Sequence, residues 1–311
     1  ARLLSTLLVV GLLAGTSAAF AIAEGLKLQT SPITGTHLAR KVFSPSCDCL
    51  SGQADFSFKV RKAGRVTVTM VDSSGREVAT VFDRSVPRGR VHVTWGGSTS
   101  AHVIAPEGSY RPSIRLPDHS TVVLPNPIRI DITPPRIQVV KATPEQLVIS
   151  PDADGRRDVL RVRYRVDEPA HALLGVNGER VLFTHTQRQQ DQLVWNGVAR
   201  GGERLPAGTY HLTLGATDTA GNVPASTRSL TVRIRFIELA RHTIRVPVGM
   251  RFGVRADTDS SVVRWRLQGR TGLAHPPLLV LRAPRQPGRY RLYVLEHGHA
   301  DSAVLIVRPR G

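Results

Sequence analysis

Two stretches of the chain repeat the same residues at the same spacing. Residues 95–110 read WGGSTSAHVIAPEGSY and residues 195–210 read WNGVARGGERLPAGTY, so a tryptophan, two glycines, a proline and a tyrosine each recur 100 residues later. Each tryptophan ends a run in which apolar and polar residues alternate, a period of two that is typical of a half-buried antiparallel strand. We therefore expect Trp95 and Trp195 to lie in the cores of two similar β-sandwiches.

The second half of each repeat predicts a turn into the next strand. The segments PEGSY and PAGTY stand at matching positions. Proline fixes φ and glycine permits conformations that other residues avoid, so together they favour such a turn. The tyrosine then begins the inward face of the following strand. Nothing in this structural motif requires chemistry, and the residues that define it are Trp95, Gly108, Tyr110, Trp195, Gly208 and Tyr210.

Other segments show the same alternation. Phe56, Phe58 and Val60 share one face of a run, and residues 160–166 place three arginines opposite four apolar residues. An Asn-Gly pair at 177–178 is a strong hairpin signal, because both residues can adopt positive φ. No long amphipathic helix pattern follows the first 25 residues.

The pattern W-x-G followed by P-x-G-x-Y resembles the immunoglobulin-like domain of the bacterial flagellar hook-capping protein FlgD, which recurs in tandem in exported bacterial proteins. The resemblance covers about 43–132 and 136–234, and the first copy lacks the glycine-rich centre of the loop after the tryptophan. It implies an all-β fold of tandem immunoglobulin-like β-sandwich domains, and the uncharged run before them predicts one N-terminal apolar helix, transmembrane or signal. It also implies a role as spacer, adhesion surface or accessory domain, although a fold does not determine a function.

Proline-rich joints mark the expected boundaries. Thr133-Pro134-Pro135 is stiff and poor in backbone donors. A third region repeats Pro-Gly-x-Tyr but places its tryptophan, Trp265, twenty-five residues before the tyrosine. The expected organisation is an anchor or signal peptide at 1–24, a linker at 25–42, domains at 43–132 and 136–234, and a third small immunoglobulin-like domain at 237–308.

Residues 3–23 carry no charge. As a helix this run would span roughly 30 Å, the thickness of the hydrocarbon core of a bilayer. It is either an uncleaved membrane helix or a secretory signal peptide cleaved after residues 21–23. We prefer the anchor because the apolar stretch is long for a signal. The expected localisation is the cell membrane, single-pass with the bulk outside the cytoplasm, or secretion if the segment is cleaved.

Arginine dominates the charge. The chain holds 37 Arg and 5 Lys against 24 acidic residues, a net charge of +18. This charge favours polyanionic partners, and we expect anionic cell-envelope polymers or other envelope proteins, with membrane contact through the N-terminal helix. Nucleic acid is disfavoured because few surface aromatics remain for base stacking. The plain alternative is a surface whose charges are simply solvated.

Residues 150–158 read SPDADGRRD. Asp152, Asp154 and Asp158 surround a glycine and could supply oxygen ligands to a structural calcium ion. The segment is not an EF-hand, because Arg163 stands at the twelfth position. The alternative is a turn whose carboxylates cap backbone amides or pair with neighbouring arginines. No other cofactor is expected.

The remaining reactive side chains suggest little chemistry. Cys47 and Cys49 could form a tight disulfide, either as a redox element or, as we prefer, as a plain loop clip. His297 and His299 share one face, but with no third ligand in view we expect no metal there. The sequence contains no HExxH, GxSxG, Walker or GxGxxG motif, so we expect no enzyme.

These features together predict a non-enzymatic cell-envelope protein whose modules act as an extracellular spacer, adhesion or protein-interaction scaffold. The alternative is a carbohydrate- or wall-polymer-binding accessory module of a secreted enzyme system, which a row of exposed aromatics would favour. An enzyme would need a deep polar pocket with converging titratable groups.

Overall fold

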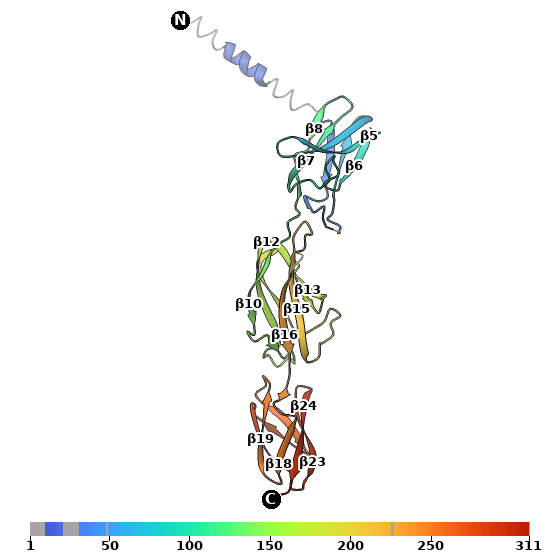
Figure 1. The fold of residues 1–311 in the computed structure, drawn as a ribbon. Coiled ribbons are helices and arrows are strands. Elements are labelled where there is room, and N and C mark those ends of the chain that lie inside the picture. Colours follow the sequence, from blue (N-terminus) through green and yellow to red (C-terminus); the bar gives the residue numbers. More distant parts are fainter. Residues whose placement is uncertain (1–9, 21–30, 48, 225–226, 311) are drawn as a thin grey trace. The chain divides into compact units, whose positions relative to one another are not determined.

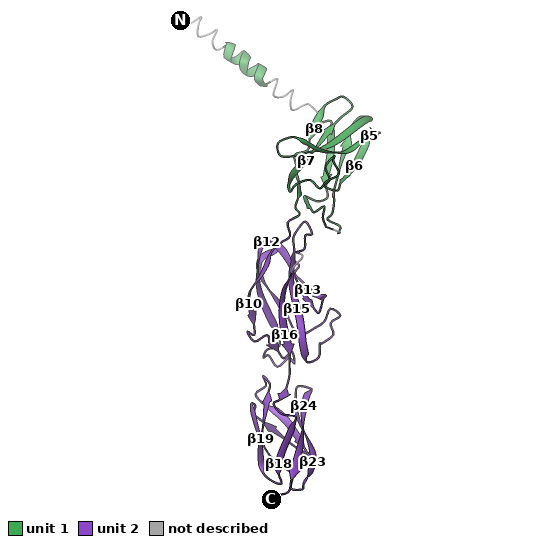
Figure 2. Ribbon diagram, in the orientation of Figure 1, with its two compact units in different colours: residues 1–132 green, residues 133–311 purple. Residues whose placement is uncertain are grey.

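The computed structural model describes residues 10–20, 31–47, 49–224 and 227–310. Apart from a helix at residues 10–20, its regular elements are strands (Figure 1). The chain divides into two compact units, residues 1–132 and 133–311 (Figure 2). The expected all-β class is therefore confirmed for the described residues.

The first unit contains one sandwich of two sheets. The smaller sheet consists of β1 (Ile33–Leu38), β3 (Ala54–Val60) and β6 (Gly89–Trp95). The larger sheet has the order β2-β9-β7-β4-β5 with β8 beside β7, where the strands are β2 (Val42–Phe43), β4 (Gly64–Val71), β5 (Glu77–Val86), β7 (Gly108–Arg115), β8 (Thr121–Val123) and β9 (Ile128–Ile130). The apolar faces of both sheets form one core, which includes Phe43, Phe58 and Trp95.

The second unit begins with a sandwich in which one long strand, β12 (Leu160–Val176), serves both sheets. Its first half pairs with β10 (Ile137–Thr143) and β14 (Arg188–Trp195). Its second half joins a sheet that also contains β11 (Val148–Ile149), β13 (Glu179–Phe183), β15 (Gly208–Thr217) and β16 (Arg228–Ile234). The ladder with β14 is irregular between Arg165 and Ala170, a stretch that contains Pro169, which has no amide to donate.

A second sandwich follows in the same unit. One sheet consists of β17 (Glu238–Leu239), β19 (Arg251–Asp257) and β22 (Leu278–Arg282). The other has the order β18-β24-β23-β20-β21, where the strands are β18 (Thr243–Pro247), β20 (Val263–Leu267), β21 (Arg270–Ala274), β23 (Gly288–Glu296) and β24 (His299–Arg308). Its core is separate from that of the preceding sandwich. We call the three bodies the first, second and third sandwich.

All three sandwiches share one topology. In each, a short strand (β2, β11 or β18) runs parallel to the last strand (β9, β16 or β24), while the other paired strands are antiparallel. In the first and third sandwiches the first four strands along the chain alternate between the two sheets, while later neighbours such as β23 and β24 pair within the larger sheet. Two antiparallel sheets packed on one core are the arrangement of immunoglobulin-like sandwiches. Tandem immunoglobulin-like sandwiches are thus present, and the region expected to form a third small domain has two sheets of its own.

The alternating runs face as predicted. Phe56, Phe58 and Val60 are buried in the first sandwich. Along residues 160–166 of the second sandwich the apolar positions are buried and the three arginines are exposed. Hydrophobic burial on one face of each strand therefore sets which side chains reach the surface.

One strand lies where a linker was expected. β1 falls within residues 25–42, pairs with β3 and buries Ile33 in the core. Only Ile33 of its six residues is fully buried, so the strand has almost no alternating pattern. Its pairing with β3, which no pattern in the sequence indicates, defines this strand.

The expected localisation as a single-pass membrane protein is wrong. Among the residues described here, no helix is both long enough and apolar enough to cross a membrane. The helix at 10–20 rises roughly 16 Å, about half of a hydrocarbon core. The remainder of the expected anchor or signal segment, residues 1–9 and 21–24, lies outside the described residues.

Candidate functional site

The repeated tryptophan and tyrosine are structural in both copies. Trp95 and Trp195 are 3% and 1% exposed. Each indole Nε1 donates to the carbonyl three residues later, at 3.0 and 2.9 Å. Tyr110 and Tyr210 pack edge-on against these indoles, and each hydroxyl donates to the carbonyl four residues before it, at 2.6 and 2.8 Å. The polar atoms of the motif are thereby engaged in building the loop.

The glycines of the motif are required by the backbone conformation and packing of the same loop. Gly97 and Gly197 have φ of +76° and +74°, in the left-handed region. A Cβ at these positions would meet the ring of Pro45 at 2.3 Å and that of Pro151 at 2.8 Å. The repeat therefore recurs because both sandwiches pack a proline of one loop onto a glycine of another. Gly108 and Gly208 stand at the first positions of β7 and β15.

The third sandwich keeps half of this arrangement. The Tyr290 hydroxyl donates to the carbonyl of Gln286, four residues earlier, at 3.0 Å. Trp265, however, lies on β20 and is only half-buried, whereas Trp95 and Trp195 end the strands that correspond to β22. The differing position of this tryptophan is why the sequence showed the third module as a distant relative.

The acidic loop at residues 150–158 is held by its own carboxylates. The two oxygens of Asp158 accept the amides of Ala153 and Gly155 at 2.7 and 2.8 Å. Asp154 accepts the amide of Arg156 at 2.7 Å, and Asp152 accepts that of Asp154 at 3.3 Å. Asp158 therefore caps the loop, and calcium binding by Asp152, Asp154 and Asp158 stays a prediction.

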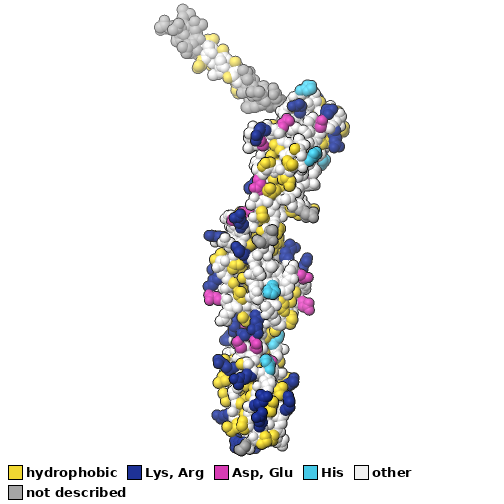
Figure 3. Space-filling view, in the orientation of Figure 1, with side chains coloured by type: hydrophobic (Ala, Val, Ile, Leu, Met, Phe, Trp, Pro, Cys, Tyr) yellow, Lys and Arg dark blue, Asp and Glu magenta, His cyan; other side chains and the backbone are white. Residues whose placement is uncertain are grey.

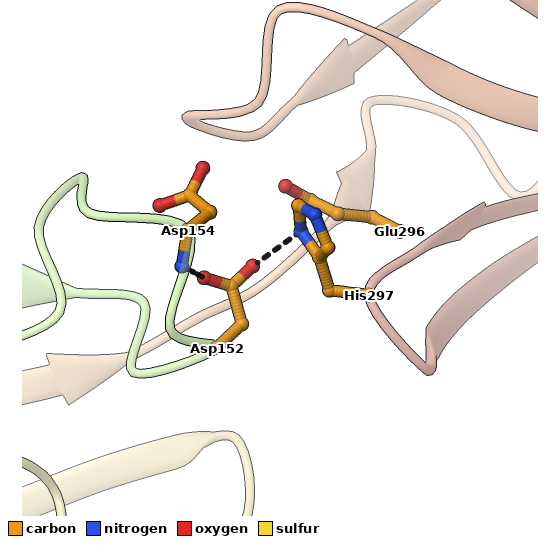
Figure 4. Close-up of side chains that lie close together, drawn as sticks. All are labelled: Asp152, Asp154, Glu296 and His297. Atoms are coloured by element: carbon orange, nitrogen blue, oxygen red, sulfur yellow. Dashed lines mark hydrogen bonds and ion pairs between the residues drawn. The ribbon is translucent and has the colours of Figure 1, made fainter.

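Asp152 and Asp154 meet two residues of the third sandwich. One ligand atom from each of Asp152, Asp154, Glu296 and His297 lies within 4.8 Å of the others (Figure 4). His297 Nδ1 is 3.1 Å from Asp152 Oδ2. The Asp152 side chain is fully buried, whereas that of His297 is about half exposed. We call these four residues the junction cluster. Sequence reasoning missed it because its two halves are 144 residues apart between Asp152 and Glu296.

Asp259 lies near the junction cluster. Its carboxylate is 3.6 Å from Arg157 Nε, and no hydrogen bond reaches either of its buried oxygens among the described residues. The pKa of Asp259 is raised to about 6, chiefly by burial and to a smaller extent by the charges of Asp154 and Asp152, while Arg157 opposes the shift. This end of the third sandwich therefore gathers buried negative charge.

A groove of 870 Å³ also lies between the second and third sandwiches. Its charges are largely paired: Arg233 contacts Glu238 at 2.9 Å, and Arg235 contacts Asp257 at 2.8 Å. Because these charges neutralise one another, we interpret the groove as part of the contact between the two sandwiches.

The outer face of the larger sheet of the third sandwich is basic. Residues opposite one another in paired antiparallel strands point to the same side, and the registers place Arg266 opposite Tyr293 and Arg264 opposite Leu295. None of the outward positions on these strands carries an acidic residue. Five exposed arginines of this face, which we call the arginine face, are Arg245, Arg264, Arg266, Arg289 and Arg291.

The arginine face has few internal partners. Arg266 stacks over the Tyr293 ring at 4.8 Å. Among the described residues, none of the five arginines forms an ion pair with a carboxylate. Figure 3 shows basic side chains across the visible face of the third sandwich, with acidic ones gathered where it meets the second.

The remaining candidates lie apart from these features. Cys47 and Cys49 are joined by a disulfide in the loop after β2. His299 stacks on Phe236 with ring centroids 3.4 Å apart, and burial lowers its pKa. His297 and His299 therefore serve different neighbours.

No family model and no curated protein matches the chain. Among solved structures, the fibronectin(III)-like modules of Clostridium thermocellum CbhA are 11% identical, with 64% of this chain and 93% of theirs covered and a TM-score of 0.34. The I9–I11 tandem of titin is 10% identical, covers 89% of this chain and 100% of its own, and has a TM-score of 0.34. A bacterial ice-binding adhesin is 12% identical, with 91% and 100% covered and a TM-score of 0.29. Likeness at this level carries no functional argument, so the fold assignment depends on strand order and the function on the residues themselves.

Proposed function

We propose that the chain is a non-enzymatic scaffold whose immunoglobulin-like sandwiches carry the arginine face to an anionic polymer, such as a polymer of the cell envelope. The observation that supports this most directly is the set of five exposed arginines on one sheet face that has no carboxylate of its own. A surface with unneutralised charge attracts a partner of opposite sign.

The arrangement of the arginine face suits a partner with repeated charges. Alternate residues along a strand are about 6.6 Å apart, and neighbouring strands about 4.8 Å apart. Both spacings are below the Debye length of about 8 Å at physiological ionic strength, so the fields of neighbouring arginines overlap. A flexible polyanion can then contact several arginines at once.

The acidic residues of the third sandwich leave this face uncompensated. From residue 237 to the C-terminus the chain holds thirteen arginines and five acidic residues. Glu238 and Asp257 pair with Arg235, and Asp259 pairs with Arg157, all where the third sandwich meets the second. Charge segregation within one sandwich, rather than net charge alone, favours binding over simple solvation.

The scaffold role is also supported by how the repeated motif is used. Trp195 and Tyr210 direct their polar atoms to backbone carbonyls of their own loop, and most of the charged side chains that line the groove between the second and third sandwiches are paired. These groups hold the fold together and do not converge on a substrate.

A binding measurement with a matched control tests the proposal. The probe is polygalacturonate, with neutral dextran as a blank. The double variant Arg264→Ser/Arg291→Ser removes two charges from the arginine face. The control Arg65→Ser/Arg76→Ser removes two arginines that are already paired with Asp83 and Asp72, so both variants have the same net charge.

We expect the arginine-face variant to bind polygalacturonate about thirtyfold more weakly at low salt, since each basic residue near an anionic surface contributes about 1 kcal/mol. The control should stay within about twofold of the natural chain, and binding should weaken as salt is added. Equal losses in the two variants, or binding undiminished in high salt, would contradict the proposal.

Two narrower expectations remain predictions. The resemblance to the FlgD immunoglobulin-like domain is one. The other is the accessory carbohydrate-binding role, which calls for a row of exposed aromatics. Among the residues that the structure describes, the exposed aromatics are Phe20 and Phe183, which belong to different compact units.

A further inference from the structure

We propose that the junction cluster binds a divalent cation that links the second and third sandwiches. Asp152 and Asp154 come from the loop after β11, Glu296 from the end of β23 and His297 from the turn before β24. An ion bound by all four would therefore bridge residues of both sandwiches.

The geometry matches the size of one ion. The four ligand atoms lie within 4.8 Å of one another. Oxygen ligands stand about 2.4 Å from calcium, so two ligands on opposite sides of one ion are roughly 4.8 Å apart. A single cation among the four side chains can therefore contact each of them.

Glu296 provides an independent indication of a ligand. This residue is 4% exposed. Its Oε2 accepts the hydroxyl of Thr258, whereas its Oε1 is buried without a hydrogen-bond partner among the described residues. Figure 4 shows the carboxyl end directed toward Asp154. A buried carboxylate oxygen without a partner is unfavourable unless a cation or a donor satisfies it.

The charge balance points the same way. The junction cluster holds three carboxylates and one imidazole, so its acidic side chains outnumber its basic one. The arginines near the loop are engaged elsewhere: Arg204 donates to the carbonyl of Pro151 at 2.7 Å, and Arg157 pairs with Asp259. A divalent cation would supply the positive charge that these buried acids lack.

Asp158 fixes the conformation of the loop, because its carboxylate accepts the amides of Ala153 and Gly155. Its neighbours Asp152 and Asp154 are thereby presented together toward the third sandwich. Carboxylates suit calcium, magnesium and manganese, while an imidazole favours zinc. Whether His297 is a ligand therefore decides which ion is preferred.

Titration calorimetry on the chelator-treated full chain tests the site, with CaCl₂, MnCl₂ and ZnCl₂ in separate runs. Asp152→Asn and Glu296→Gln each replace one charged ligand by an isosteric amide. Glu238→Gln is the matched control, because Glu238 lies at the same contact between sandwiches but pairs with Arg233. Near-UV circular dichroism of the three tryptophans checks that every variant is folded.

We expect one saturable site for at least one of the three ions, and affinity at least about tenfold weaker in both cluster variants. The Glu238→Gln variant should bind as the natural chain does. His297→Gln identifies the ion, since it should weaken the binding of zinc strongly and that of calcium or manganese little. Bound ion should also slow hydrogen exchange in peptides covering residues 150–158 and 295–299.

Two outcomes would overturn the proposal. One is the absence of saturable binding of any of the three ions up to about 5 mM, beyond the range of weak extracellular calcium sites. The other is ion binding that is equally strong in the folded Asp152→Asn and Glu296→Gln variants. Neither outcome bears on the arginine face, whose test uses other residues.

Discussion

Replacing Gly197 with alanine tests the explanation of the repeated motif. Gly197 has φ of +74°, and an added Cβ would lie 2.8 Å from Pro151 Cγ and 3.3 Å from Ile234 Cδ1. A left-handed conformation costs an L-residue about 1–2 kcal/mol, and overpacking a core costs about 1–3 kcal/mol. Because the proline ring has little freedom to move aside, we expect Gly197→Ala to lower the free energy of unfolding of the second sandwich by about 2–4 kcal/mol.

The control is Gly201→Ala, in the same loop. Gly201 has no positive φ and no atom within 4 Å of an added Cβ, so this change should be neutral or stabilise by up to about 1 kcal/mol. Urea unfolding is monitored by hydrogen exchange of peptides from β14 and β15. This measurement reports the unfolding of the second sandwich separately from that of the other two. If the two alanine variants unfold at the same urea concentration, the packing of proline onto glycine does not explain the repeat.

Three further predictions concern hydrogen bonds and pH. Tyr210→Phe removes the hydroxyl bond to the carbonyl of residue 206 and should cost the second sandwich about 0.5–1.5 kcal/mol in the same urea series. The hydrogen bond from the Ser74 hydroxyl is the chief cause that lowers the pKa of Asp72 to about 2 from its ordinary 3.8. The stabilisation that ionised Asp72 gives the fold is complete above about pH 4 and should disappear as the pH falls toward 2. Thermal unfolding should show this loss in the natural chain and not in Asp72→Ala. The pKa of Asp259 is raised to about 6, so its protonated form is favoured in the folded state. With chelator present, the free energy of unfolding of the second unit should therefore fall as the pH rises from about 4 to above 6. Asp259→Asn should remove this dependence on pH.

Much of the fold could be predicted because the signals for it are local. The burial of Trp95 and Trp195, the outward arginines at 161, 163 and 165, and the strands that begin at Gly108 and Gly208 all follow from a period of two and from turn chemistry. β1 was missed because one buried residue in six gives no period. The third sandwich was recognised only in part because Trp265 stands on a different strand from the tryptophans of the other two.

The candidate sites could be predicted only in part, because their residues come from distant parts of the chain. Asp152 and Asp154 were noticed as an acidic loop, and Asp158 was grouped with them although it caps the loop. Glu296 could not be associated with them, since nothing in the residues around it indicates which loop it will face. The arginine face could not be predicted for the same reason, because the sequence of a single strand does not indicate which strands will be its neighbours in the sheet.

By itself, the sequence determined the all-β class, the duplicated core around a buried indole and the excess of arginine, since each depends on residues close together in the chain or on composition. Only the tertiary structure decided which charges are left over. Pairing among strands and contact between the second and third sandwiches place Arg235 against Asp257 and Arg157 against Asp259. The same packing gathers five arginines on one face without a partner carboxylate and brings Asp152 within reach of His297. Electrostatic attraction acts over a few ångströms in space, and distances of that kind are set by packing rather than by separation along the chain.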